Sequence, residues 1–279
     1  MEKYELIPAQ LLYEGAVQAD VFFEPEAAGF ETCTLAHDVR YCRQLWEQEL
    51  PSALVRRIGF PMSPALVARE RYIVQGTITC CTFARQYGVA FNIAGGTHHA
   101  GRNWGEGFCL LNDQAIAAAY LIRYKDFKQI LIIDLDVHQG NGTAQIFAHE
   151  DRVFTFSMHG ETNFPFRKEC SDVDIGLPEG TDDDAYLAML NQQLAMIFDR
   201  IKPDFVFYQA GVDVLATDKL GKLALTRSGC GRRDELVFSY CRAARVPLQV
   251  SMGGGYSPHI RDVVDAHCQT FQTAIRMYD

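Results

Sequence analysis

The stretch that decides the fold is DLDVHQGNGT at residues 134–143, which directly follows the apolar run QILII at residues 129–133. Such a run is typical of a buried strand, and two carboxylates and an imidazole come at its end. Side chains of a strand alternate between its faces, so a strand that continues through His138 places Asp134, Asp136 and His138 on one side. If the chain turns earlier, the three converge through loop geometry instead. Ligands bind at this end of strands in open α/β sheets, so the stretch predicts a metal site.

Strands and helices alternate along the chain. We expect strands at residues 89–92, 130–134, 152–157, 204–209 and 246–251. We expect helices at about residues 4–13, 63–87, 112–123, 142–149, 181–201, 228–244 and 258–276, with an irregular segment of short helices before residue 61. This order predicts the α/β class, in a three-layer α/β/α arrangement with a central, mostly parallel sheet. No linker or repeat interrupts residues 1–279, so we expect a single domain.

The composition suits a globular enzyme. Of 279 residues, 48% are hydrophobic and 22% charged, and the formal net charge is -9. This charge opposes binding to nucleic acid or to anionic membranes, and the short basic pairs Arg56-Arg57 and Arg232-Arg233 are expected on solvated faces. Nine cysteines without a CxxC pair indicate reduced thiols. With no signal peptide and no apolar run long enough to span a bilayer, we expect a cytoplasmic protein.

Three side chains that follow strands are the expected metal ligands. Asp136 and His138 form the first pair, and Asp213 at the end of VFYQAGVD, residues 206–213, is the third. Asp218 lies nearby in the sequence and is the alternative to Asp213. An Asp–His–Asp set without thiolates suits zinc with an open coordination position, and also suits iron(II) or manganese.

Further polar residues lie where they can serve such a metal. His98 and His99 follow Gly95-Gly96-Thr97, and one of them can act as general base while its neighbour acts as an electrostatic or proton-shuttling partner; satisfied core histidines are the alternative. Asp134 and Asn141 are predicted to orient imidazole rings through hydrogen bonds, although Asn141 also suits a simple turn.

Aromatic residues in loops suggest a substrate slot. Tyr256 follows three glycines and can donate a hydrogen bond to a developing oxyanion, although an ordinary half-buried aromatic is equally compatible with the sequence. Phe108 and Phe164, if they face each other, make a narrow apolar slot for an alkyl chain.

Five segments between about residues 90 and 260 together resemble the histone deacetylase family of the arginase/deacetylase fold. In family order they are GGTHH at 95–99, GFC at 107–109, DLDVH at 134–138, AGVD at 210–213 and GGGY at 253–256. The segments AGVDVLATDKLG at 210–221 and RRDELVF at 232–238 resemble the class IV branch and its bacterial relatives. Asn141 stands where class I enzymes carry Asp, which also points away from class I.

The resemblance implies roles for individual residues. It implies zinc bound by Asp136, His138 and Asp213, and His99 as general base and acid with His98 as its partner. It implies that Tyr256 polarises the scissile carbonyl. Its implied acyl-lysine tunnel is walled by Phe108 and Phe164, with the backbone of Gly107 accepting a hydrogen bond from the substrate. It also implies a structural potassium ion held by Asp134, Asp136, His138, Ser157 and Met158.

The chain departs from the family pattern in two places. The family begins with a strand and a loop bearing His, Pro and Arg, whereas this chain starts at the following segment, which resembles Tyr4–Gly15. Two interpretations follow from this: either the start of the sequence is truncated, or the first strand of the family is absent. Polyamine-preferring relatives carry an acidic residue at the position that matches Leu220, so a free polyamine is a less attractive substrate.

The expected function is removal of acyl groups from N-acyl-lysine, or from a similar small acylated amine, by a metal-activated water. One alternative is a binuclear manganese ureohydrolase of the same fold, which needs a second Asp two residues after Asp213, where this chain has Leu215. Another is a catalytically silent protein that binds acyl-lysine.

Overall fold

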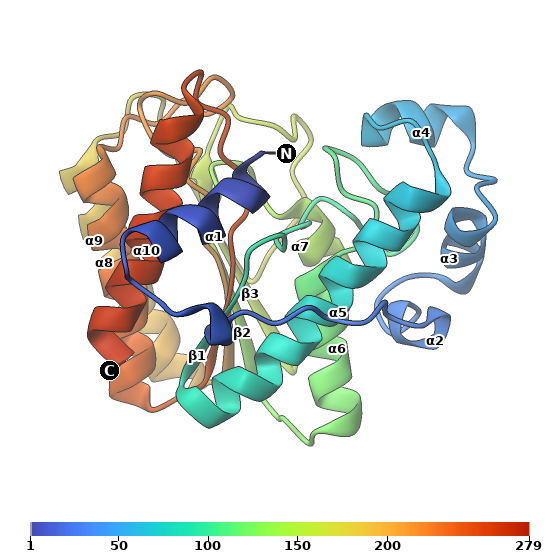
Figure 1. Cartoon of the computed structure of the whole chain (residues 1–279), viewed down its shortest axis with the longest axis horizontal. Helices are drawn as coiled ribbons and strands as arrows, with labels where there is room; N and C mark the ends of the chain where they lie inside the picture. Colours follow the sequence, from blue (N-terminus) through green and yellow to red (C-terminus); the bar gives the residue numbers. More distant parts are fainter. Residues whose placement is uncertain (1, 279) are drawn as a thin grey trace.

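The computed structural model describes residues 2–278 and contains one sheet of six strands, all pairing in parallel (Figure 1). The strand order across the sheet is β1-β6-β5-β2-β3-β4. The strands are β1 (Val89–Asn92), β2 (Ile130–Asp134), β3 (Val153–Gly160), β4 (Val173–Leu177), β5 (Phe205–Gln209) and β6 (Leu248–Ser251). The predicted α/β class and parallel sheet are confirmed.

Helices cover both faces of the sheet, with α8, α9 and α10 on one side and α5, α6 and α7 on the other (Figure 1). The main helices are α1 (Lys3–Tyr13), α5 (Pro64–Tyr87), α6 (Asp113–Tyr124), α7 (Asn141–Phe147), α8 (Asp183–Ile201), α9 (Arg227–Ala244) and α10 (Ile260–Tyr278). Short elements fill the segment before residue 61, namely η1 (Ala19–Val21), α2 (Phe30–Cys33), α3 (Val39–Trp46) and α4 (Ser52–Ile58). None of the described helices combines the length and the apolar run that a bilayer crossing requires.

The central strand β2 supplies both hydrophobic cores. Leu131 and Ile133 pack into the core beneath α8 and α9, whereas Ile130 and Ile132 pack into the core beneath α5 and α6. Because side chains of a strand alternate, a strand covered on both faces is apolar at every position, and all five residues of β2 are buried. The parallel arrangement brings the loops that follow β1, β2, β5 and β6 to one edge of the sheet.

Local capping fixes where the helices begin. The Ser63 hydroxyl accepts the backbone N–H of Leu66 at 3.1 Å, and Pro64 occupies the first turn of α5. The Asn112 side chain caps α6 by accepting the backbone N–H of Ala115 at 3.0 Å. Asp182 caps α8 in the same way. Three of the predicted helix starts therefore lie within about two residues of the observed ones.

The structure corrects two expectations about strands. The strand β2 ends at Asp134, so Asp136 and His138 lie in the following loop and are not brought together by strand alternation. The edge strand β4 was not predicted. Its sequence VDIGL carries Asp174 and Gly176, residue types that are depleted in strands, and its side chains are only partly buried.

Candidate active site

Three buried side chains from two loops converge beyond the carboxyl ends of β2 and β5. The Nδ1 atom of His138 lies 3.1 Å from Asp136 Oδ1 and 3.1 Å from Asp213 Oδ2. One ligand atom from each residue lies within 4.8 Å of the other two, so a single ion can reach all three. The loop after β2 supplies Asp136 and His138 through its own turns, which is the second of the two routes that the sequence left open.

Backbone N–H groups orient the two carboxylates. Asp136 accepts from the N–H of Gly254 at 2.8 Å, and Asp213 accepts from the N–H of Val137 at 3.0 Å. A Cβ atom at Gly254 would overlap Asp213, and one at Gly211 would overlap Asp136. The glycines of AGVD and GGGY are therefore needed because the backbone passes directly against the two carboxylates.

The alternative ligand Asp218 does not join this cluster. Its carboxylate accepts the backbone N–H groups of Leu220 at 2.8 Å, Gly221 at 2.9 Å and Tyr256 at 2.6 Å. Asp218 thus ties the loop after β5 to the loop after β6. Among the described residues, the grouping that can hold a metal ion contains Asp213.

The three buried groups of the cluster shift one another's pKa values. Burial, followed by the charge of Asp136, raises the pKa of Asp213 to about 7. Burial opposes protonation of His138, but its hydrogen bonds to Asp136 and Asp213 outweigh burial and raise its pKa to about 10. Two buried carboxylates facing one imidazole therefore favour a bound positive charge. A divalent cation supplies this charge in place of the protons that it displaces from these groups. The donor set of two carboxylates and one imidazole fits zinc or iron(II).

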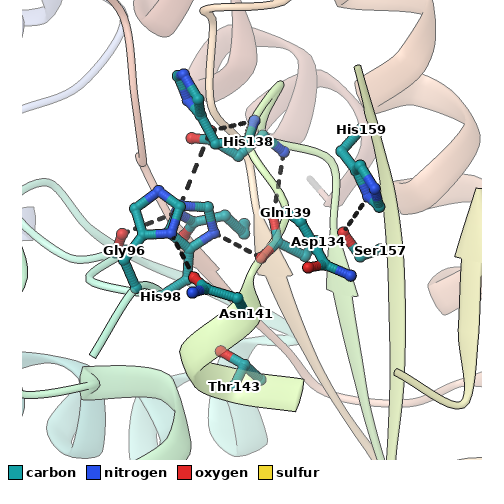
Figure 2. A network of polar contacts seen from close by, with 12 residues as sticks. Gly96, His98, Asp134, His138, Gln139, Asn141, Thr143, Ser157 and His159 are labelled. Carbon is teal, nitrogen blue, oxygen red and sulfur yellow. Dashed lines mark hydrogen bonds and ion pairs between the residues drawn. The ribbon is translucent and has the colours of Figure 1, made fainter. Parts of the chain in front are cut away.

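Two adjacent imidazoles lie beside the cluster, on the loop that follows β1. The Nδ1 atom of His98 lies 2.7 Å from Asp134 Oδ2, and the Nδ1 atom of His99 lies 2.7 Å from Asn141 Oδ1. Their ring centroids are 4.1 Å apart. Figure 2 shows His98 close to Asp134 at the end of β2, with Asn141 at the start of α7. The orienting contacts predicted for Asp134 and Asn141 are thus present.

The surroundings push the pKa values of the two imidazoles in opposite directions. Burial opposes protonation of His98, but the charges of Asp134 and Asp136 outweigh it and raise its pKa to about 9. Burial, followed by the charge of His98, lowers the pKa of His99 well below its usual value. Paired groups with separated pKa values are a common feature of acid–base sites, and here His99 is the neutral member.

Two residues that the sequence analysis missed hold the histidine loop. Asp113 accepts the backbone N–H of Thr97 at 2.8 Å and that of Gly96 at 3.0 Å. The Gln209 side-chain amide donates to the carbonyl oxygen of Gly96 at 2.8 Å. Asp113 directly follows the α6 cap Asn112, and an aspartate in the first turn of a helix is common without any functional role. Gln209 could have been identified from the sequence as a candidate site residue, because it is a polar residue at the end of an apolar strand.

Glu106 and Arg57 extend the contacts of Asn141. The Asn141 Nδ2 atom donates to Glu106 Oε1 at 2.5 Å, and Glu106 Oε2 pairs with the guanidinium of Arg57. Glu106 lies in the turn before Gly107, and Arg57 lies near the end of α4. The sequence gave no indication of this pair.

A second arginine corrects the expectation for the basic pair Arg232-Arg233. Arg233 is fully buried rather than solvated. Its guanidinium pairs with Asp234 at 2.8 Å and donates to the carbonyl oxygens of Gly211 at 2.5 Å and Leu135 at 3.3 Å. Those carbonyls belong to the two loops that carry Asp213 and Asp136.

A cavity of about 220 Å³ opens onto the cluster. Its lining includes both adjacent histidines, two cluster residues, and backbone or side chains of the loops after β1 and β6, namely His98, His99, Asp136, His138, Gly107, Phe108, Cys109 and Tyr256. Burial raises the pKa of the Cys109 thiol well above its usual value, which fits a wall residue rather than a nucleophile.

The aromatic residues Phe60, Phe108 and Tyr256 line the cavity, whereas Phe164 is not part of its lining and lies behind His99. The ring of Phe164 packs edge-on against His99, with the ring centroids 5.0 Å apart, and the ring of Phe108 packs against Phe60 at 5.1 Å. Phe108 is 44% exposed and Tyr256 is 36% exposed, and the Tyr256 ring lies 6.3 Å from that of His138. These positions suit a mouth that an extended apolar group can enter.

Three further residues singled out in the sequence, Leu220, Ser157 and Met158, do not line this cavity. Leu220 is 48% exposed, and the cavity lining given above does not include it. Ser157 is the neighbour of Asp134 across β2 and β3, and its hydroxyl lies 2.9 Å from the Nδ1 atom of His159 (Figure 2). Met158 is the next residue along β3. Their tunnel and potassium roles stay predictions.

Comparison with known proteins shows which family the chain belongs to. The sequence model of the histone deacetylase domain matches residues 1–271 of the chain. The chain belongs to the histone deacetylase family. The resemblance seen in the sequence is thereby confirmed at the level of the family.

Related family members differ in length from this chain. An uncharacterized protein of Picosynechococcus sp. is 45% identical over 278 residues, covering 100% of this chain and 93% of that protein. Histone deacetylase 2 of Arabidopsis thaliana is 29% identical over 255 residues, covering 88% of this chain and 66% of that protein. Histone deacetylase 1 of Homo sapiens is 35% identical over 205 residues, covering 69% of this chain and 40% of that protein.

Solved structures share the fold. A crystal structure of an HDAC homolog complexed with SAHA superimposes with a TM-score of 0.80 at 27% identity, covering 93% of this chain and 74% of that one. The HDAC homolog from Aquifex aeolicus gives a TM-score of 0.79 at 26% identity, covering 92% of this chain and 74% of that one.

Proposed function

We propose that this histone deacetylase-family protein hydrolyses the amide bond of N-acyl-lysine, or of a similar small acylated amine, with zinc held by Asp136, His138 and Asp213. The observation that carries the proposal is the buried Asp–His–Asp cluster, which lies in one cavity with two imidazoles of opposite protonation preference. When bound, the metal supplies Lewis-acid catalysis to the acyl carbonyl and to water. Iron(II) fits the same donor set.

The neutral imidazole of His99 is the proposed general base. Its Nδ1 atom faces Asn141, so its Nε2 atom is the one available to take a proton from the attacking water. The partner His98 carries positive charge beside it, because Asp134 and Asp136 favour its protonated form. A protonated imidazole then delivers a proton to the nitrogen of the leaving amine.

Tyr256 and the aromatic mouth are proposed to bind the acyl amide. The hydroxyl of Tyr256 donates to the oxyanion that develops from the carbonyl. Phe108 and Phe164 line the way in for the alkyl part of the lysine, and the backbone of Gly107 accepts a hydrogen bond from the substrate. The HDAC homolog complexed with SAHA, at 27% identity, supports an acyl-amine type of ligand for this cavity. A potassium ion near Asp134 and Ser157 belongs to the same proposal.

The test is a panel of fluorogenic acyl-lysines from acetyl to long-chain, assayed with a defined zinc load and again after treatment with a chelator. We expect hydrolysis that the chelator abolishes and that added zinc restores. His99→Ala and Tyr256→Phe should each lower kcat by about a hundredfold or more while zinc remains bound. Full activity in either variant removes that residue from its role, and turnover that survives complete metal removal refutes the proposal.

A further inference from the structure

A line of three polar contacts runs from the candidate base His99 to the surface of α4. The Asn141 side chain lies 2.7 Å from His99 Nδ1 on one side and donates to Glu106 at 2.5 Å on the other. Glu106 in turn pairs with Arg57. The Glu106 side chain is only 7% exposed, whereas that of Arg57 is 48% exposed. The line therefore connects a buried imidazole to a solvated guanidinium.

Arg57 is itself held in place. Its guanidinium carbon lies 4.5 Å from the centroid of the Trp104 ring, a cation–π arrangement. Its carbonyl oxygen accepts the backbone N–H of Gly107 at 3.3 Å, which ties α4 to the loop of Glu106. Because the backbone and the side chain of Arg57 both contact this loop, Glu106 has one well-defined orientation.

The donor and acceptor groups along this line fix the direction of each hydrogen bond. Arg57 is a donor only, and the Glu106 carboxylate paired with it offers only acceptors. An asparagine amide has one accepting end and one donating end, so Asn141 must turn its Nδ2 atom toward Glu106 and its Oδ1 atom toward His99. The Oδ1 atom cannot donate. Nδ1 of His99 must then carry the ring proton, which leaves the lone pair on Nε2.

We infer that Glu106 is a positioning residue that sets the tautomer of His99 through Asn141. This inference rests on the proposed function for its catalytic consequence, since only the Nδ1-protonated tautomer leaves Nε2 free to act as a base. The tautomer itself is a property of the four side chains and is measurable without any substrate.

The variant Glu106→Gln tests the inference with little change of shape. The introduced amide has one accepting oxygen, and Arg57 requires an acceptor, so the amide nitrogen is left facing Asn141. Asn141 must then reverse, presenting its Nδ2 atom to His99. The His99 Nδ1 atom becomes an acceptor and the proton moves to Nε2, which removes the base.

A second variant reverses this effect. In Asn141→Asp/Glu106→Gln the introduced carboxylate accepts from both neighbours, because it has no donating end. His99 Nδ1 again donates, now to the carboxylate introduced at position 141. The amide nitrogen introduced at position 106 donates to the same carboxylate, and the oxygen of that amide still faces Arg57. The double variant keeps the total charge of the wild-type pair. It should therefore restore the tautomer that the single variant loses.

The measurement is a long-range ¹H–¹⁵N correlation spectrum of the zinc-loaded protein labelled at histidine, with His99→Ala used to assign the signals. We expect the wild type and the double variant to show His99 protonated at Nδ1, and Glu106→Gln to show it protonated at Nε2. With an acyl-lysine substrate, Glu106→Gln should lower kcat at least about tenfold with unchanged KM and zinc content, and the double variant should recover most of that loss. The exposed Glu49→Gln is the matched control, with wild-type spectrum and kinetics expected.

Two results overturn the inference. One is a Glu106→Gln protein that keeps His99 protonated at Nδ1. The other is a double variant that stays protonated at Nε2, which would mean that Glu106 acts on His99 by a route other than Asn141. Failure of the proposed function can be told apart from failure of this inference. If the zinc-loaded wild type hydrolyses none of the acyl-lysines, the proposed function fails, but the three proteins can still show the expected tautomers of His99.

Discussion

The guanidinium of Arg233 donates a 2.5 Å hydrogen bond to the carbonyl oxygen of Gly211, two residues before Asp213. The same terminal nitrogen donates to Leu135, the residue before Asp136. One buried cation therefore connects the two loops that present the candidate metal ligands. Asp234 pairs with it, and the hydroxyls of Tyr208 and Thr270 donate to Asp234 at 2.6 Å and 2.7 Å.

Arg233→Lys should weaken zinc binding. Lysine keeps the charge but lacks the fork of donors that reaches two carbonyls and a carboxylate at once. Loss of such supporting contacts typically costs ten- to a hundredfold in metal affinity. We expect an increase of at least about tenfold in the zinc Kd, measured by competition with a chromogenic chelator.

Val237→Ala is the control for Arg233, because it removes buried apolar volume from the same helix, α9, without touching a polar contact. Both variants should lower Tm, but only Arg233→Lys should change the zinc Kd. An equal change in both would show that general loosening of the core is the cause.

Asp113→Asn should lower kcat while the metal stays bound. The carboxylate accepts from Gly96, Thr97 and Thr77, and the introduced amide nitrogen would face one or more of these donors. The histidine loop would then shift, and small displacements of catalytic groups cost on the order of a hundredfold in rate. Kinetics and zinc content of the purified variant would be measured together.

The matched control for Asp113 is Asp182→Asn, which alters the helix cap of α8. It should lower stability by about 1 kcal/mol or less and leave kcat as in the wild type. If Asp113→Asn behaves in the same way, Asp113 serves only as part of the α6 cap.

Folding stability should fall as pH drops from about 6.5 toward 4 because of His37. The N–H of Asn112 donates to its Nε2 atom, and its Nδ1 atom lies 2.9 Å from the carbonyl oxygen of Gly101, so the ring must be neutral. Burial lowers the pKa of His37 to about 4. The unfolded chain therefore takes up the proton first, which costs roughly 3 kcal/mol of the free energy of unfolding by pH 4.

Urea unfolding at several pH values would measure this effect. His37→Gln keeps a donor and an acceptor but does not titrate, so its stability should decline less over the same range. Parallel pH curves for the wild type and the variant would argue against His37 as the source.

Glu70 should have the opposite dependence on pH. Its side chain is buried, and the guanidinium of Arg69 lies 3.3 Å from one of its carboxylate oxygens. Burial raises its pKa to about 7. The folded protein holds this proton longer than the unfolded chain, so stability is lost as pH rises from about 4.5 to 7. Glu70→Gln should therefore raise the free energy of unfolding at pH 8 by about 3 kcal/mol and change it much less at pH 5. An equal effect at both pH values would contradict this account.

The sequence predicted the sheet because its strands are buried on both faces. Runs such as FVFY at 205–208 are apolar over their length and are flanked by helices with clear caps, so the apolar pattern and the helix-end signals agree. The edge strand β4 lacks both signals. Asp174 accepts hydrogen bonds from Gln139 and from the backbone of Ser171, so its carboxylate suits the loop contacts at the edge better than a sheet core.

The sequence also predicted which residues meet at the candidate site, but not how each is held. Asp136, His138 and Asp213 lie next to strand ends, and the topology brings those ends together. Their supports come from residues far away in the chain, as when Arg233 reaches Leu135 across 98 positions. A buried charge inside a helix looks like any surface charge until the packing is known. For that reason Arg233 was assigned to a solvated face.

The glycines at 211 and 254 have a practical consequence for anyone who wants to redesign this protein. Any side chain at either position collides with a carboxylate of the cluster, so mutant libraries should leave both codons unchanged. Leu220 is 48% exposed, so substitutions there carry little risk to folding, whereas Phe108 has a φ of 69°, a conformation in which β-branched side chains are strained. Variation in a library can therefore be confined to exposed positions, while the backbone that passes against the two carboxylates is kept as it is.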